Sequence, residues 1–273
     1  MNSPNRRSDY SGQAGLSLIE LLIALAISSF LILGITQIYI DNKRSYNFQQ
    51  SQAGNQENHR FLVMMLDYYL NRAGYQRNPV DFPDEAFKAA AANSDCEEFK
   101  AEAALTPARG GTGLCIRYFP LTSGELDCVG NATPAFNDNL AYSSGTPVTM
   151  VLRYVPSADL NGSLQCKVNG QTAELLTGIA DFRMTLGMAS ARGENIRERL
   201  EISDWAADKG QVIQVAYSAL LASERALRSS DSLALSDWKA AADAAQTSRI
   251  EAGDKGQLFQ VASSTVSLRN LMP

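Results

Sequence analysis

The chain has 273 residues, a formal net charge of −5 at pH 7, 45% hydrophobic residues, four cysteines and one histidine. This length suits one or two domains with a sizeable core, and the acidic balance argues against a nucleic-acid partner. A single histidine, and cysteines without a C-x-x-C pair, argue against a zinc site, so we expect neither a metal nor a cofactor.

The first element is an apolar run from Leu16 to Ile40. As a helix it would be roughly 37 Å long, which is enough to span a bilayer. A secretory signal peptide has a shorter apolar region that ends at a small-residue cleavage site, whereas the small residue here, Gly15, precedes the run. Hydropathy alone fits a plain transmembrane anchor. A carboxylate inside that anchor, Glu20, costs free energy in lipid and requires an explanation.

The helix is expected to continue beyond the apolar run, over residues 16–75, with the membrane-spanning part at about residues 16–40. No proline occurs between Leu16 and Pro79, and Gly74 supplies a C-terminal stop. The second half of this helix carries apolar residues at helical spacing, which must pack on another part of the protein. These residues are Leu62, Met65, Leu66, Tyr69 and Ala73.

Residues 76–273 are predicted to form a globular β-rich domain. A loop-dominated connection at 78–112, with a short helix near 87–92, precedes segments of period-2 alternation that predict strands. Asn161-Gly162 is a hairpin turn signal, and a Ser/Ala/charge-rich excursion at 223–256 contains short helical turns near 238–245. A long helix followed by strands predicts an α+β fold, in which the helix packs on an antiparallel β-sheet. The predicted strands lie at 114–119, 147–156, 164–168, 179–188, 212–221 and 258–268.

The four cysteines are Cys96, Cys115, Cys128 and Cys166. An even number in a domain tethered beyond a membrane favours disulfides formed in an oxidising compartment, with reduced core cysteines as the alternative. Four cysteines allow three pairings. We favour the sequential one, Cys96 with Cys115 and Cys128 with Cys166, and closing a loop of about 20 residues contributes roughly 3 kcal/mol.

Residues typical of catalysis are scarce. No G-x-S-x-G, H-E-x-x-H or P-loop pattern occurs, and the only histidine, His59, lies in the predicted helix. The glycines of 110–113 lack the following helix of a phosphate site, and the mixed charges of 192–201 are typical of a solvated face. Trp205 and Trp238 are expected to pack against other side chains. We therefore do not expect an enzyme.

The segment "GLSLIELLIALAIS", which begins at Gly15, resembles the prepilin motif of type IV pilins and pseudopilins. That motif has a short polar leader, a glycine, an apolar residue, a sequence close to "TLIE" and a long apolar stretch. The segments "CIRYFP", "DCVGNA", "LTGIADFRM" and "VSLRNLMP" are similar to those of minor pilins of the PilW family. The resemblance covers nearly the whole chain after the leader and implies a type IV pilin-like fold.

The resemblance also implies how the N-terminus is processed. Residues 1–15 would form a leader peptide, which a prepilin peptidase removes by cleavage between Gly15 and Leu16. The new terminus at Leu16 would be N-methylated, and Glu20 would act in subunit assembly. The mature chain would be a single-pass inner-membrane protein with a periplasmic C-terminal domain, and later a part of the pilus tip at the cell surface.

The function implied by this resemblance is structural. A minor pilin primes type IV pilus assembly, is incorporated near the tip and supports pilus biogenesis and twitching motility. Its partners would be other minor pilins, the major pilin, the prepilin peptidase, the assembly platform and a tip adhesin. The alternatives are a J-type pseudopilin of a type II secretion system and, more distantly, an adhesive or DNA-uptake pilin, against which the acidic balance argues.

Glu20 then has a physical explanation. In a bundle of apolar helices an unpaired carboxylate is costly, and the N-terminal amine of a neighbouring subunit neutralises it at only one axial offset. Buried ion pairs are better suited to fixing a register than to adding net stability. We therefore expect Glu20 to specify the stagger between subunits, while apolar packing supplies the affinity.

Overall fold

The computed structural model describes residues 15, 17–78, 80–140, 142–191 and 194–272. Its contacts divide the chain into two compact units, residues 1–48 and residues 49–273, which we call the N-terminal and C-terminal units. Most of the predicted leader, residues 1–14, and the predicted new terminus, Leu16, lie outside the described residues.

Helix α1 (Leu18–Arg72) is 55 residues long. Its first turn begins with hydrogen bonds from the main-chain amides of Glu20 and Leu21 to the Ser17 carbonyl, at 3.0 and 3.1 Å. Gly74 follows its end in the left-handed conformation, with φ of +71°, which a residue without a side chain adopts at little cost. An 18-residue window of α1 has a mean hydropathy of 2.6 and is not buried, so the helix is long and apolar enough to cross a membrane.

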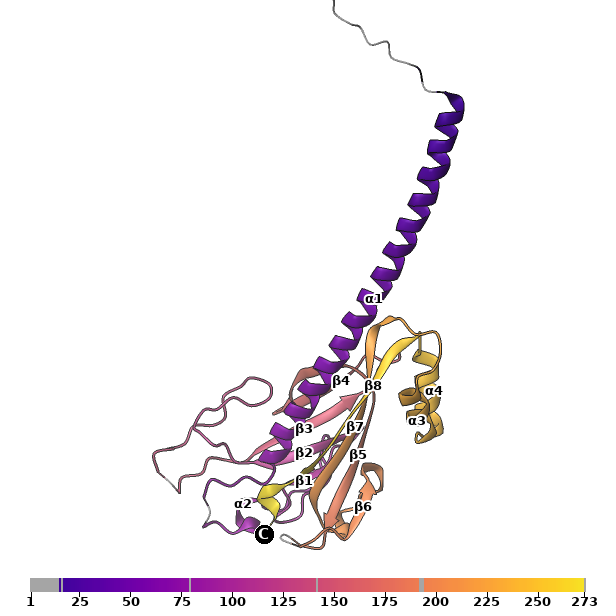
Figure 1. Cartoon of the computed structure of the whole chain (residues 1–273). Coiled ribbons are helices and arrows are strands. Elements are labelled where there is room, and N and C mark those ends of the chain that lie inside the picture. The colour runs from indigo at the N-terminus through magenta and orange to yellow at the C-terminus, as the bar shows by residue number, and fades with distance from the viewer. Residues whose placement is uncertain (1–14, 16, 79, 141, 192–193, 273) are drawn as a thin grey trace, which may run out of the picture. The chain divides into compact units, whose positions relative to one another are not determined.

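The described residues of the C-terminal unit form one antiparallel sheet of eight strands (Figure 1). The order is β1-β2-β3-β4-β5-β7-β8. The fifth strand is long enough to pair with β4 through its first half and with β6 and β7 through its second half. The strands are β1 (Leu105–Pro107), β2 (Gly113–Tyr118), β3 (Val148–Val155), β4 (Gly162–Val168), β5 (Gln171–Ala189), β6 (Glu198–Glu201), β7 (Gln211–Ala226) and β8 (Gln257–Ser267).

One face of the sheet, the inner face, packs on the part of α1 that belongs to the C-terminal unit. Leu62, Leu66 and Leu70 of this helix are fully buried in the main apolar core. Tyr217 of β7 is buried in the same core, and its hydroxyl donates to a carboxylate oxygen of Asp67 at 3.3 Å. The predicted α+β fold, a long helix packed on an antiparallel sheet, is therefore confirmed.

The opposite, outer face is covered by two separate segments. The first, residues 87–104, has almost no regular structure, and we call it the loop cover. The second consists of α3 (Leu233–Ala240) and α4 (Ala244–Gly253), which we call the helical cover. Successive side chains of a strand point to opposite faces. Cys115 and Val151 therefore face the loop cover, and Leu220 faces the helical cover, while their neighbours point to the main core. Ala180 also packs in the helical-cover cluster, beside a register shift of β5.

The structure differs from the predicted fold in three details. The short helix near 87–92 lies earlier, as α2 (Pro83–Ala86), because Pro83 suits a first helical turn, whereas Ala90 forms a β-bridge with Phe99. The short helical turns predicted near 238–245 are present, but as two helices, α3 and α4, that extend beyond this range, because Asp243 caps a new helix in a capping box with Gln246.

The third difference concerns the charged segment 192–201. Its described charged side chains are exposed, in agreement with the predicted solvated face, but a strand was not predicted there. Its last four residues, Glu198–Glu201, form β6 and pair with Thr185–Met188 of β5. Leu200 is the single buried residue of this short edge strand. One apolar residue between charges gives no alternation to read, so the sequence alone did not reveal the strand. The strand β1 was also missed, because its three residues are too few to show an alternation.

Candidate functional site

The predicted cleavage position lies just before α1. Gly15 is described, exposed and outside any helix or strand. No other heavy atom lies within 4 Å of the position where a Cβ of Gly15 would be. A glycine without close neighbours among the described residues leaves room for a peptidase to approach the backbone. The geometry is therefore compatible with cleavage after Gly15, and its partner position, Leu16, lies outside the described residues.

Glu20 lies in the first turn of α1 and is exposed. A carboxylate in this position interacts favourably with the helix dipole. Within the described part of the chain, no cationic group forms an ion pair with Glu20.

The N-terminal unit exposes an unusual amount of apolar surface. Phe30, for example, is 82% exposed, and Leu18 is 78% exposed. A monomer in water rarely leaves a contiguous patch of this kind uncovered. Lipid or the apolar helices of other subunits are the two environments that suit such a surface. The exposed residues include Leu21, Leu22, Ile23, Leu25, Ile27, Leu31, Ile32, Leu33, Ile35 and Ile38.

Both disulfides of the structure join the cysteines that the sequential pairing predicts. Cys96 pairs with Cys115, with the Cα atoms 5.8 Å apart, and this bond attaches the loop cover to β2. Cys128 pairs with Cys166 of β4, with the Cα atoms 6.2 Å apart and 38 positions apart in sequence. This second bond attaches the long connection between β2 and β3 to the sheet.

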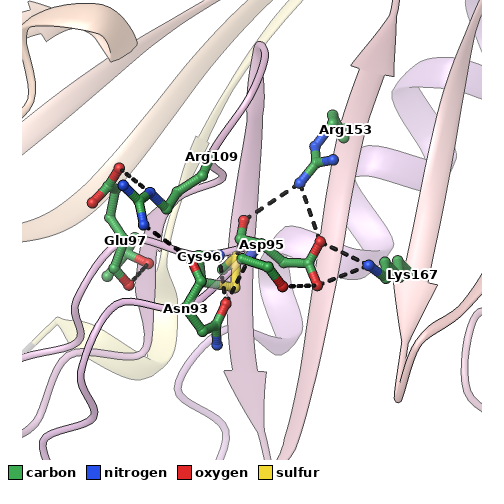
Figure 2. The surroundings of a disulfide bond; sticks show 10 residues. Asn93, Asp95, Cys96, Glu97, Arg109, Arg153 and Lys167 are labelled. Carbon is green, nitrogen blue, oxygen red and sulfur yellow. Dashed lines mark hydrogen bonds and ion pairs between the residues drawn. A yellow bond between two sulfur atoms is a disulfide. The ribbon is translucent and has the colours of Figure 1, made fainter.

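A cluster of charged and polar groups surrounds the first disulfide (Figure 2). Asp95, next to Cys96, accepts hydrogen bonds from the Lys167 ammonium at 2.8 Å, and the Arg153 guanidinium lies 3.6 Å from one of its carboxylate oxygens. Its partner Lys167 holds the pKa of the Asp95 carboxyl below its usual range. Asn93 accepts from the main-chain amides of Asp95 and Cys96. These contacts connect the loop cover to β3 and β4.

A buried cation also fastens the loop cover. Arg117 of β2 is 7% exposed and donates to the main-chain carbonyls of Phe87, Lys88 and Ala103. Its guanidinium lies 4.2 Å from the centre of the Phe99 ring. Burial lowers the pKa of Arg117 to about 10, so the side chain stays charged at neutral pH. Nothing in the sequence distinguished Arg117 from an exposed strand arginine.

A buried anion fastens the helical cover. Asp181 of β5 is 2% exposed and accepts a hydrogen bond from the Trp238 indole at 2.9 Å. Arg249 of α4 donates to the other carboxylate oxygen and also to the Ala180 carbonyl at 2.7 Å. Arg183 lies over the Trp238 ring at 4.2 Å. Trp238 therefore packs, as predicted, but its role as a donor to a buried carboxylate was not foreseen.

The residues considered for catalysis do not come together. His59 contacts the Gln260 side chain at 3.2 Å and lies far in sequence from the cysteines and the tryptophans. Trp205 packs against the main core. Among the described residues no group of three or more His, Cys, Asp or Glu side chains is placed to hold a metal ion.

The comparisons with known proteins concern both parts of the chain. Residues 10–36 match the family model described as the prokaryotic N-terminal methylation motif. These residues include Gly15, Leu16 and Glu20, so the N-terminus is that of a type IV prepilin-like protein. A comparison with curated proteins gives no match.

The structure is similar to that of a type IV-like pilin from Thermus thermophilus. The TM-score is 0.40 and the sequence identity is 13%, over 81% of this chain and 98% of that chain.

Proposed function

We propose that this chain is a minor pilin of the PilW family that primes type IV pilus assembly and is incorporated near the pilus tip, where it supports twitching motility. The observation that carries the proposal is the match of residues 10–36 to the N-terminal methylation motif, directly before and within a helix apolar enough to span a membrane. The proposal of the PilW family in particular is supported by the segments that resemble PilW proteins.

Processing is the first step of the proposed function. A prepilin peptidase cleaves after Gly15, Leu16 is methylated, and residues 1–15 are lost. The chain then stays in the inner membrane through α1, with residues 76–273 as its periplasmic domain. From there it joins the other minor pilins and the major pilin on the assembly platform, beneath a tip adhesin.

Cleavage is tested by Gly15→Val, because a branched side chain crowds the backbone at the peptidase site. Gly34→Val is the matched control, since Gly34 lies within α1 and a Cβ there meets open space. Mass spectrometry of the membrane-extracted chain should show residues 16–273 with one added methyl group for the wild type and for Gly34→Val. For Gly15→Val it should show an uncleaved chain. A normal terminus at Leu16 in Gly15→Val would contradict the cleavage assignment.

Assembly is tested at Glu20. Glu20→Gln and Glu20→Leu should be processed and inserted normally but should fail to co-purify with the other minor pilins, because neither neutralises a partner's amine. Glu20→Asp should be intermediate, since it keeps the charge but withdraws it by one methylene. Normal assembly of Glu20→Leu would mean that apolar packing alone sets the stagger. Loss of type II secretion with normal pili in a null strain would assign the chain to the J-type pseudopilins instead.

A further inference from the structure

The two outer edges of the sheet differ in how they are protected. At one edge, β1 has three residues and ends in Pro107, which has no main-chain donor. The Pro107 carbonyl already accepts from the Glu97 amide of the loop cover at 3.1 Å. Short edge strands, prolines and covering loops are the devices by which proteins prevent a further strand from pairing. The β1 edge is therefore closed.

The other edge, β8, has none of these devices. It is 11 residues long, and "QLFQVASSTVS" contains no proline and no charged residue. Its pairing with β7 runs without a register shift from Gln214 with Ser267 to Ala222 with Phe259. A long, regular and uncharged edge is a template for another strand.

The direction of its hydrogen-bonding groups follows from the register. The Leu268 amide donates to the Ile213 carbonyl at 2.8 Å, and Ser267 is opposite Gln214. In an antiparallel pair alternate residues exchange hydrogen bonds with the partner strand. The even-numbered residues 260–266 therefore bond to β7. The main-chain groups that point away from the sheet are those of Phe259, Val261, Ser263, Thr265 and Ser267.

These outward groups are unpaired within the part of the chain that the structure describes. No main-chain or side-chain group there bonds the amide or carbonyl of any of the five residues. The side chains of Val261, Ser263 and Thr265 are exposed, and Val261 is 37% exposed. A row of free amides and carbonyls with small or β-branched side chains between them suits a peptide backbone in extended conformation.

We propose that the free edge of β8 binds an extended segment of a different pilus subunit, which adds a strand to the sheet. The added strand forms main-chain hydrogen bonds with residues 259–267, and uncharged side chains on it pack beside Val261 and Thr265. This inference rests on the proposed function, which supplies the other subunits. It names the surface by which the C-terminal unit, as distinct from the N-terminal unit, contacts a neighbour.

A second copy of the chain fits this edge less well. The Asn55 side chain donates to the Leu258 carbonyl and the Asn71 carbonyl accepts from Asn270, so this part of α1 runs in the same direction as β8. Two copies joined by antiparallel β8 strands would place their Gln49 ends at opposite ends of the pair. Under the proposed function, however, both chains enter one membrane through residues that precede Gln49 in α1, at about 16–40. A different subunit can offer a strand in the direction that a common membrane requires.

Hydrogen exchange tests the proposal residue by residue. In the full-length chain alone, in detergent, the outward amides of 261, 263 and 265 should exchange rapidly and the inward amides of 262, 264 and 266 slowly. In the purified complex with co-expressed minor pilins, the outward amides should slow by at least about tenfold while the inward amides change little. This odd-numbered pattern is specific to an added strand.

Three variants sharpen the test. Ser263→Pro removes an outward donor without touching the β7 ladder, and Ser263→Ala removes only the hydroxyl. Losing one or two hydrogen bonds should weaken entry into the complex by about tenfold for Ser263→Pro, and Ser263→Ala should behave as the wild type. Thr265→Lys, which places a charge beside the edge, should also weaken entry if the proline variant does not fold.

The outcomes separate the two proposals. Outward amides that stay rapid in a complex containing the chain would overturn the edge proposal and leave the pilin function standing. Concentration-dependent protection in the isolated chain would overturn it in favour of a second copy. A wild-type chain that enters no complex with any pilin would overturn the proposed function and the edge proposal together.

Discussion

Each of the two covers is held on the outer face of the sheet by a buried charged side chain, and the two charges are opposite in sign. The loop cover is fastened by a buried cation, Arg117, which donates to three main-chain carbonyls. The helical cover is fastened by a buried anion, Asp181, which accepts from the side chains of Trp238 and Arg249. The difference follows from the backbone of each cover.

An irregular segment leaves carbonyls without partners, and a buried carbonyl without a donor is costly. A guanidinium with five donors satisfies several of them at once. Helices bond their own carbonyls internally, so α3 and α4 need only a side-chain acceptor. The loop cover also carries a disulfide, Cys96–Cys115, because a segment with few internal hydrogen bonds loses more conformational entropy when it is ordered.

Removing a disulfide should give the largest effect. Cys96→Ala with Cys115→Ala should lower the free energy of unfolding by about 3 kcal/mol, and Cys128→Ala with Cys166→Ala by about 4 kcal/mol, because the second bond closes the longer loop. Urea unfolding of the full chain in detergent measures both. Hydrogen exchange should rise in the loop cover, residues 87–104, for the first pair of changes only. Increased exchange in α3 and α4 would show that the two covers are not held independently.

The second-largest effect is expected at Asp181, the buried anion that holds the helical cover. Asp181→Leu removes the acceptor of Trp238 and leaves the Arg249 guanidinium without its carboxylate. Breaking a buried ion pair costs several kcal/mol. Because Arg249 and Arg183, which both lie near the Asp181 carboxylate, are partly exposed, we expect the free energy of unfolding to fall by about 2–3 kcal/mol. Trp238 should become more exposed, which acrylamide quenching of tryptophan fluorescence measures against the wild type. Asp237→Leu, on the exposed side of α3, is the control and should change stability little.

Arg117→Met sharpens the same comparison on the loop cover. The change keeps an apolar stem beside Phe99 but leaves the Lys88 and Ala103 carbonyls without their donor. The Phe87 carbonyl keeps the Glu102 amide, which donates at 2.9 Å. We expect a loss of about 2 kcal/mol, from the cost of unpaired buried acceptors. Arg109→Met, at an exposed position, is the control in the same urea unfolding experiment, and equal losses for both would show that Arg117 is not an anchor.

The sequence predicted strands with regular alternation, and it predicted the disulfides. The alternation in "TMVLRYV" identified β3, and the Asn161-Gly162 signal identified its hairpin with β4. The even number of cysteines suggested disulfides, and the structure has the sequential pairing. In contrast, Arg117 and Asp181 alternate with apolar neighbours as exposed strand residues do. Their burial depends on covers that are distant in sequence, so no local pattern reveals it.

Gly15 and Glu20 were identified in a different way. They belong to a motif whose residues are close together in the sequence, and residues 10–36 match the prokaryotic N-terminal methylation motif. The free edge of β8 was not visible in the sequence. "LFQVASSTVS" predicts a strand, but only the topology shows that this strand has a single neighbour.

The smallest effect is expected at Asp95, the surface contact of the loop cover. Lys167 donates to both carboxylate oxygens at 2.8 Å, and this hydrogen bond lowers the pKa of Asp95 in the folded chain. A lowered folded pKa means that the unfolded chain binds the proton more readily, so the stabilisation is complete above the ordinary pKa of about 4 and is lost as the pH falls through the folded value. Because the pair is solvent-accessible, Asp95→Asn should cost less than about 1 kcal/mol at pH 7. The difference between wild type and variant should vanish in acid, which urea unfolding at pH 7 and below pH 3 measures. A difference that persists unchanged in acid would contradict stabilisation through the Asp95 charge, because the main-chain carbonyl that accepts from Arg109 and Arg153 is the same in both chains.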